Sequence, residues 1–168
     1  MERGDSRGHP ALTDESTSLP NRLHFDTVFG VVFAAGDRGI PVALILVEIS
    51  DYDSWTSELE PAALTSALAD LGILIQSTTR KTDLVARTAE DRFALVLLDC
   101  NLAGARLVAD RLDVALEEFR RARGFHTSMG AAVYARTMES PEDLVAAASS
   151  ALQAAREAGG NSMEFQGS

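Results

Sequence analysis

Two apolar runs separated by a short polar turn are the feature that most constrains the fold of this chain. Residues 83–87 and 93–98 are rich in Leu, Val, Ala and Phe, and the five residues between them include Glu90, Asp91 and Arg92. Apolar runs joined by three to five turn residues are typical of a β-hairpin. The sequence therefore predicts a hairpin whose turn carries two carboxylates and one guanidinium.

Helical and strand patterns alternate along the rest of the chain. The run 42–47 is continuously apolar and rich in branched residues, which predicts a central strand buried on both faces. Ser140, Pro141 and Asp143 have the spacing of an N-cap, a first helical residue and a capping box. Helices are predicted after Asn21, from Pro61, over 102–121 and from Pro141, and further strands over 127–133 and 162–165. We therefore expect an α/β sandwich in which helices cover a central mixed sheet of about five strands.

Composition narrows the classes of partner. The chain has 168 residues, enough for one domain with a sizeable core, and a formal net charge of -10. Nucleic acids and anionic membranes both require a clustered basic surface, so neither is an expected partner. Because no apolar run approaches the roughly 18 residues of a membrane span, and no signal-type segment is present, we expect a cytoplasmic location. Residues 1–18 are polar and predict a disordered leader, with one domain over 19–168.

Several short segments, in order along the chain, resemble motifs of the GGDEF domain of bacterial diguanylate cyclases. The hairpin resembles D-L-V-A-R-x-G-G-D-E-F-A, with Ala89-Glu90-Asp91-Arg92-Phe93 at the name-giving turn. Residues 14–22 are similar to D-x-L-T-G-L-P-N-R, residues 127–132 to T-x-S-x-G-V-A, and residues 151–161 to A-L-Y-x-A-K-x-x-G-R-N. The resemblance implies a palm-like core related to nucleotidyl cyclases. In active relatives two such domains, each holding GTP and Mg²⁺, form cyclic di-GMP.

Most positions that carry this chemistry in the family have changed here. The family's metal-binding carboxylates correspond to Glu48 and Asp91, but its second acidic residue on the first strand is Ser50. The family's phosphate-binding Lys corresponds to Asp53, and the acidic residue after Asp91 is replaced by Arg92. The guanine-reading Asn and Asp are Thr56 and Thr65, the two glycines are Ala89 and Glu90, and a C-terminal Arg is Gly160.

These losses span metal, base and phosphate recognition, so the sequence predicts a pseudoenzyme with no catalytic residues and no required cofactor. Each missing electrostatic contact costs about 3–4 kcal/mol of barrier stabilisation in related chemistry. Glu48 and Asp91 are the remaining candidates for metal ligands, and solvated carboxylates at strand ends are the alternative interpretation. We do not expect Mg²⁺ to bind.

One family feature is retained, since Arg80-Lys81-Thr82-Asp83 matches the R-x-x-D inhibitory site upstream of the hairpin. In relatives that use this site, Arg and Asp bind cyclic di-GMP. A guanidinium presents a rigid fork of donors to phosphate or to guanine O6 and N7, and a carboxylate accepts from the guanine N1–H and amino groups. The alternative is a surface ion pair worth at most about 1 kcal/mol.

Three hypotheses follow for function. The first is a catalytically inactive signalling domain that binds cyclic di-GMP through Arg80 and Asp83 and acts through a protein partner. The second is a protein-interaction or dimerisation scaffold that needs no ligand, with Tyr52 and Trp55 either on its surface or in its core. The third is a residual enzyme that relies on Glu48 and Asp91. A homodimer is left open.

Overall fold

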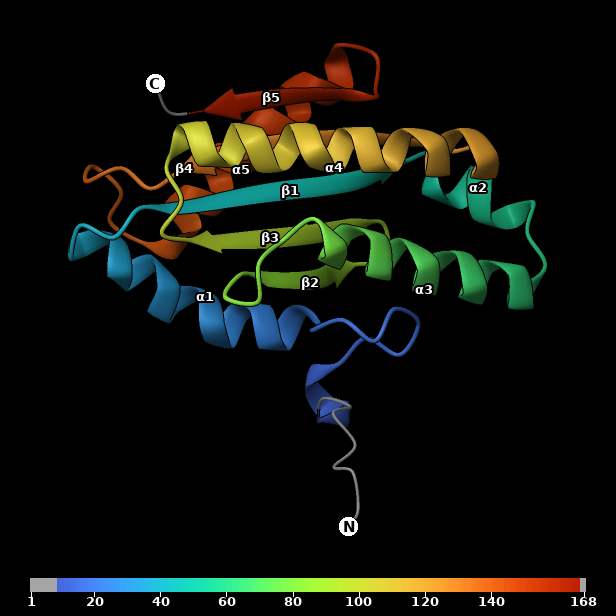
Figure 1. The fold of residues 1–168 in the computed structure, drawn as a ribbon, viewed down its shortest axis with the longest axis horizontal. Coiled ribbons are helices and arrows are strands. Elements are labelled where there is room, and N and C mark those ends of the chain that lie inside the picture. The colour runs from blue at the N-terminus through green and yellow to red at the C-terminus, as the bar shows by residue number, and fades with distance from the viewer. Residues whose placement is uncertain (1–8, 167–168) are drawn as a thin grey trace.

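Three layers make up the domain, with helices on both faces of one five-stranded sheet (Figure 1). This computed structural model describes residues 9–166. Within that range no helix is long and apolar enough to cross a membrane. The elements in chain order are η1 Pro10–Leu12, α1 Arg22–Asp37, β1 Val42–Ser50, α2 Tyr52–Ser57, α3 Pro61–Ser77, β2 Leu84–Ala89, β3 Arg92–Leu98, α4 Leu102–Arg123, β4 His126–Val133, α5 Pro141–Glu157 and β5 Ser162–Gln166.

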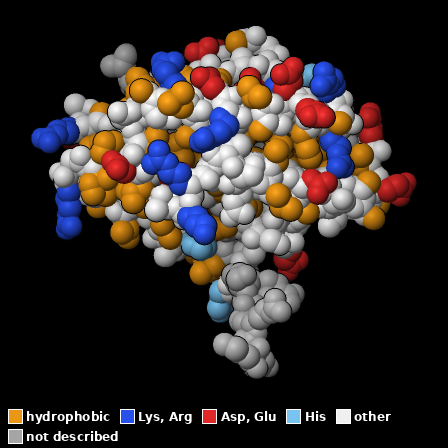
Figure 2. Space-filling view, viewed as in Figure 1, with side chains coloured by type: hydrophobic (Ala, Val, Ile, Leu, Met, Phe, Trp, Pro, Cys, Tyr) orange, Lys and Arg blue, Asp and Glu red, His pale blue; other side chains and the backbone are white. Residues whose placement is uncertain are grey.

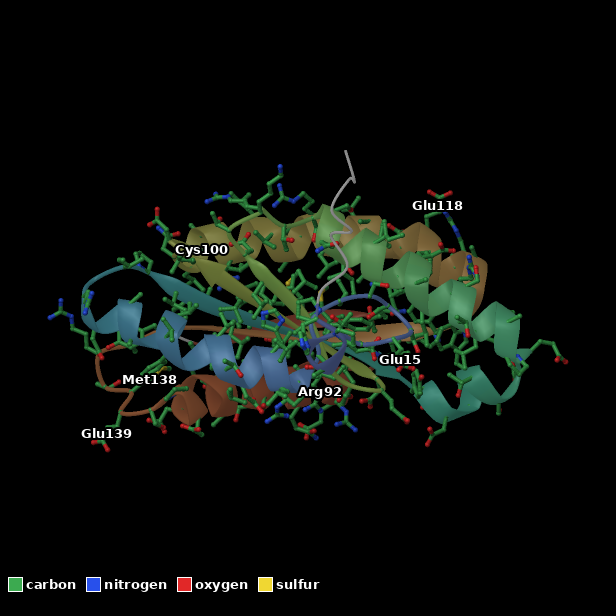
Figure 3. All side chains as sticks on the ribbon, turned by 90° about the horizontal axis from the view of Figure 1, so that it is seen from below. Glu15, Arg92, Cys100, Glu118, Met138 and Glu139 are labelled. Atoms are coloured by element: carbon green, nitrogen blue, oxygen red, sulfur yellow. The ribbon has the colours of Figure 1, made fainter. Side chains whose placement is uncertain are left out.

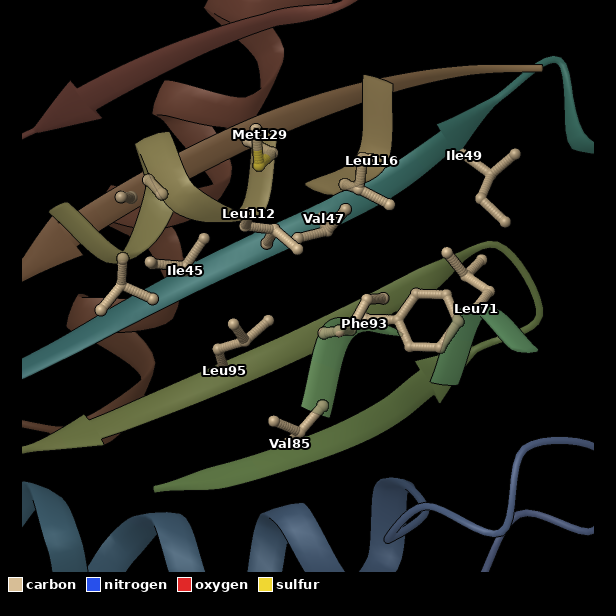
Figure 4. Packing of buried hydrophobic residues seen from close by; sticks show 14 of the residues in the cluster. Ile45, Val47, Ile49, Leu71, Val85, Phe93, Leu95, Leu112, Leu116 and Met129 are labelled. Atoms are coloured by element: carbon tan, nitrogen blue, oxygen red, sulfur yellow. The ribbon is translucent and has the colours of Figure 1, made fainter. Parts of the chain in front are cut away.

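The central position of β1 confirms the strand predicted from its continuous apolar run. The strand order is β2-β3-β1-β4-β5, antiparallel throughout except for the parallel pair β4–β5. Successive side chains of a strand point to opposite faces, and β1 therefore contributes to two separate cores. Ala43, Ile45, Val47 and Ile49 pack toward α3 and α4 (Figure 4), and Val42, Leu44 and Leu46 toward α1 and α5. The predicted sandwich with a mixed sheet of about five strands is confirmed.

Local capping chemistry determines where the main helices begin. The Asn21 side chain accepts a hydrogen bond from the His24 N–H at 3.1 Å and caps α1. Ser140 and Asp143 form the predicted capping box of α5, and Pro61 occupies the first turn of α3. The short helix α2 was not predicted, because six residues are too few for an apolar periodicity to be recognised.

The motif around Gly130 in β4 has a packing explanation. A Cβ atom at Gly130 would lie 2.1 Å from the backbone nitrogen of Leu152 and 2.5 Å from the carbonyl oxygen of Ala148 in α5. Backbone atoms cannot rotate away as a side chain can, so glycine is required where α5 crosses the sheet.

The predicted leader is partly wrong. Residues 1–8 lie outside the described residues, but residues 9–18 form a 3₁₀ turn and a loop that pack against the domain. The Asp14 carboxylate accepts hydrogen bonds from the N–H and the hydroxyl of Thr17, and Arg87 also donates to it. Polar side chains thus fix this segment through hydrogen bonds, which an apolar pattern does not reveal. The folded domain therefore includes these residues.

Candidate functional site

A wide cleft lies where β1 ends beside the turn between β2 and β3. It encloses about 940 Å³. The antiparallel register places Glu48 of β1 directly opposite Arg92 of β3, and the Ile49 N–H donates to the carbonyl oxygen of Asp91 at 2.8 Å. The residues that line the cleft come from three places: Glu48, Ile49, Ser50, Asp51, Tyr52, Asp53 and Ser54; Ala89, Glu90 and Asp91; and His126, Arg156, Gly159 and Gly160.

Two arginines bind the carboxylate of Glu48, the one acidic group buried in this cleft wall. Its side chain is 7% exposed. Arg92 donates from Nη2 to Oε2 at 2.6 Å, and the Nε of Arg156 lies 3.3 Å from Oε1. Each oxygen of Glu48 therefore faces a guanidinium of this chain.

Guanidinium groups of this chain compete with any divalent cation for the carboxylate of Glu48. Mg²⁺ requires oxygen ligands free to coordinate it, and both oxygens of Glu48 already face cationic groups. Asp91 lines the same cleft, yet within residues 9–166 no group of three or more His, Cys, Asp or Glu side chains is placed to hold a metal ion.

Acidic side chains dominate the rest of the cleft. Asp51, Asp53 and Glu90 join Asp91 along its wall. Arg156 also lines the cleft, but its guanidinium already forms an ion pair with Glu48. A polyphosphate carries several negative charges, so the negative electrostatic potential of these acidic side chains opposes its approach to the cleft.

A buried arginine supports the turn of the hairpin. Arg87 donates through Nη2 to the Glu90 carbonyl oxygen at 2.6 Å and to the Tyr52 hydroxyl at 3.1 Å, and its Nη1 pairs with Asp14 at 3.2 Å. One side chain thus joins the turn, α2 and the N-terminal segment. Sequence reasoning missed this role, although the pairing of Asp14 with Arg87, which both belong to recognised motifs, was an available signal.

The aromatic pair considered for an interaction surface belongs mainly to the core. Trp55 is 6% exposed, and its indole Nε1 donates to the Arg123 carbonyl oxygen at 2.8 Å. Its ring centroid lies 4.8 Å from that of Phe125. Tyr52 is half-buried and accepts from Arg87. The contacts of Trp55 hold α2 against the C-terminal end of α4.

Arg80 and Asp83 lie together at the other end of the hairpin, away from the cleft. They precede Leu84, the first residue of β2, whereas the turn follows the last residue of this strand. The Asp83 Oδ2 accepts from the Arg80 backbone N–H at 2.9 Å, and the Asp83 N–H donates to the Arg80 carbonyl oxygen at 3.1 Å. In the described part of the chain the Arg80 guanidinium forms no ion pair or hydrogen bond, and the side chain is exposed.

A buried thiol lies close enough to this pair to be affected by both charges. Burial raises the pKa of Cys100, the nearby Asp83 carboxylate raises it further, and Arg80 acts in the opposite direction. Figure 3 shows Cys100 well away from Arg92 of the cleft. The hairpin therefore separates two sites, one at its turn and one at its open end.

A family model described as "Diguanylate cyclase, GGDEF domain" matches residues 11–162. The chain belongs to the GGDEF domain family. Among curated GGDEF relatives, the diguanylate cyclase TpbB of Pseudomonas aeruginosa is 28% identical over 163 residues, 93% of this chain and 38% of the relative. The probable diguanylate cyclase DgcE of Escherichia coli is 28% identical over 112 residues, 66% of this chain and 10% of the relative. The chain thus spans less than half the length of these relatives.

Solved structures of GGDEF domains share the fold. The GGDEF domain of DgcB from Caulobacter crescentus, solved in complex with c-di-GMP, superposes with a TM-score of 0.84 at 20% identity, covering 94% of this chain and 96% of that one. The GGDEF domain of TpbB from Pseudomonas aeruginosa gives a TM-score of 0.80 at 25% identity, covering 91% and 93%. These matches confirm the predicted fold class.

Proposed function

We propose that this GGDEF domain is catalytically inactive and binds cyclic di-GMP through Arg80 and Asp83, passing the signal to a protein partner. The proposal rests on a difference between two guanidinium groups, one paired and one available for a ligand. Arg92 is paired with Glu48 in the cleft, whereas the Arg80 guanidinium is exposed and forms no ion pair or hydrogen bond within residues 9–166. Solved structures of related domains support both the ligand and the partner in this proposal. DgcB was solved with c-di-GMP, and SiaD was solved with its activator SiaC.

Loss of turnover follows from the charges in the cleft. Condensing two GTP molecules requires cations beside the triphosphate, and here the retained carboxylate Glu48 is bound by Arg92 and Arg156. Asp53 and Glu90 add negative charge where a phosphate would approach. The glycines that let phosphate approach the backbone in the family are replaced by Ala89 and Glu90.

Cyclic di-GMP recognition requires little rearrangement at the open end of the hairpin. The hydrogen bond from the Arg80 N–H to the Asp83 Oδ2 already fixes the backbone between the two residues. The Arg80 guanidinium can donate to phosphate or to the guanine O6 and N7, and the remaining lone pairs of Asp83 can accept from the guanine N1–H and amino group. Lys81 adds a second positive charge on an otherwise acidic chain.

Titration calorimetry with cyclic di-GMP tests the binding part of the proposal. We expect measurable binding by the unmodified protein and a loss of about tenfold to a hundredfold for Arg80→Ala, the size of a charge-assisted contact. Lys81→Ala is the matched control, since it removes the same charge one residue away and should change affinity by less than about threefold. Absence of heat with the unmodified protein overturns the binding proposal.

Incubation with GTP and Mg²⁺ or Mn²⁺ tests the inactivity part separately. We expect no cyclic di-GMP by chromatography. Product formation that Glu48→Ala abolishes would overturn the inactivity proposal and leave the binding result unaffected.

Exposed hydrophobic side chains favour the second candidate function, a protein-interaction scaffold. Val31 on α1, Ile73 on α3 and both Leu107 and Val114 on α4 are 66–74% exposed. If cyclic di-GMP does not bind, contact through these helix faces is the function that remains.

A further inference from the structure

The outer face of α4 has a charge and hydrophobic pattern that is complementary to itself. We propose that α4 of one chain pairs antiparallel with α4 of a second copy across a two-fold axis near Val114, forming a weak, concentration-dependent homodimer. This surface is separate from the ligand site proposed at Arg80 and Asp83, and its formation requires no ligand.

The first observation is that α4 leaves two large apolar side chains in solvent. Leu107 is 70% exposed and Val114 is 72% exposed. They are seven residues apart, two helical turns, and therefore lie on one stripe of the helix. Figure 2 shows hydrophobic, acidic and basic side chains intermingled on the face that carries α3 and α4.

The second observation is that the charged residues beside this stripe form no ion pair in the described part of the chain. Asp110, Arg111, Glu118 and Arg121 are all exposed. The residues three and four positions from Arg111 on either side are Leu107, Val108, Val114 and Ala115, so this helix offers Arg111 no acidic neighbour. Figure 3 shows the Glu118 side chain pointing away from the molecule.

The spacing of these charges fits an antiparallel pair. Arg111 and Glu118 are seven residues apart and lie on one edge of the stripe, while Asp110 and Arg121, eleven apart, lie on the other edge. A two-fold axis brings the same edges of two antiparallel helices together. Arg111 precedes Val114 by three residues and Glu118 follows it by four, which leaves Arg111 and the second copy's Glu118 within about 1.5 Å along the helix axis.

The same operation brings Asp110 to the second copy's Arg121 with an axial offset of about 4.5 Å, which a long arginine side chain can span. Symmetry then gives four interchain ion pairs around an apolar centre. A parallel pair would instead set the edge with Arg111 and Glu118 against the edge with Asp110 and Arg121, so that Arg111 would face Asp110 of the second copy. Exchanging the charges of Arg111 and Glu118 distinguishes the two arrangements, because the double exchange restores opposite charges only in the antiparallel pair.

The neighbouring helix α3 is bonded to the end of α4 and also leaves a large apolar side chain in solvent. Arg123 of α4 donates to the Asp70 carboxylate of α3 at 2.9 Å. Ile73, three residues after Asp70 on the same helix, is 66% exposed. A contact restricted to these helices falls near or below the roughly 1,000 Å² of stable interfaces. The dimer is accordingly expected to dissociate on dilution.

Analytical ultracentrifugation of the ligand-free protein from about 10 µM to about 1 mM brackets weak association. We expect the weight-average mass to rise toward that of a dimer. Arg111→Glu and Glu118→Arg should each raise the dissociation constant by about tenfold or more, and the double exchange Arg111→Glu with Glu118→Arg should restore it.

Arg136→Glu, an equal charge change at an exposed position outside α4, is the control and should leave association unchanged. A monomer at every concentration overturns the proposal, as does association that neither single exchange weakens. Loss of association in both single variants without recovery in the double variant also overturns the assigned pairing.

Discussion

Replacing Arg92 by Ala should destabilise the domain because it removes the closer of the two cations that compensate buried Glu48. The Glu48 side chain is 7% exposed and its 2.6 Å partner Arg92 is 36% exposed, whereas Arg156, at 3.3 Å, is 52% exposed. Removing one partner of a fully buried ion pair costs 3–5 kcal/mol. Since Arg92 is partly solvated and Arg156 remains, we expect a loss of about 2 kcal/mol for Arg92→Ala.

Urea denaturation followed by circular dichroism measures this loss. For a denaturant slope of about 2 kcal/mol/M, the midpoint should fall by about 1 M in Arg92→Ala. Arg156→Ala should cost about 1 kcal/mol or less, because its pairing is longer and more solvated. Adding Glu48→Gln to Arg92→Ala should recover part of the stability, since no buried charge then lacks its partner. A loss for Arg92→Ala no larger than that for Arg156→Ala would refute the reasoning.

Three further predictions concern other parts of the domain. Gly130→Ala should cost about 3 kcal/mol in thermal or urea unfolding, since a Cβ there meets the backbone of α5, whereas Gly30→Ala, in open space on α1, should be neutral or slightly stabilising. Because burial raises the pKa of the Cys100 thiol, labelling by a thiol reagent near neutral pH should be slow in the folded protein and fast in urea. The hydrogen bond from Tyr134 to Asp37 raises the pKa of Tyr134. The stability that this bond contributes is therefore present below the ordinary tyrosine pKa and is lost as pH rises through the pKa of the folded state. Ultraviolet titration of a variant lacking Tyr52, the other tyrosine, should show the raised pKa, and Asp37→Asn should lower it.

The fold was predictable because several local patterns agreed. The apolar run at 42–47, the capping box at Ser140 and Asp143, and the hairpin at 83–98 each specified an element, and the structure contains all of them. What the sequence could not convey was the partner of each polar side chain. Asp14 appeared to belong to a polar leader, yet its contacts with Thr17 and Arg87 attach that segment to the domain.

The candidate site was predicted only in part. Glu48 was recognised as a carboxylate of metal-ligand type, but its partners are set by the β1–β3 register and by the end of α5. Register depends on the pairing of whole strands, so a single sequence does not place Arg92 opposite Glu48. Arg80 and Asp83 lie beside each other because they belong to one short loop, and their role in ligand binding stays a prediction.

Calorimetric titration of the unmodified protein with cyclic di-GMP, repeated with Arg80→Ala and Lys81→Ala, tests whether the open end of the hairpin is a ligand site. We predict binding that weakens by about tenfold to a hundredfold in Arg80→Ala and changes by less than about threefold in Lys81→Ala. No heat with the unmodified protein, or equal affinity in all three, would contradict this prediction.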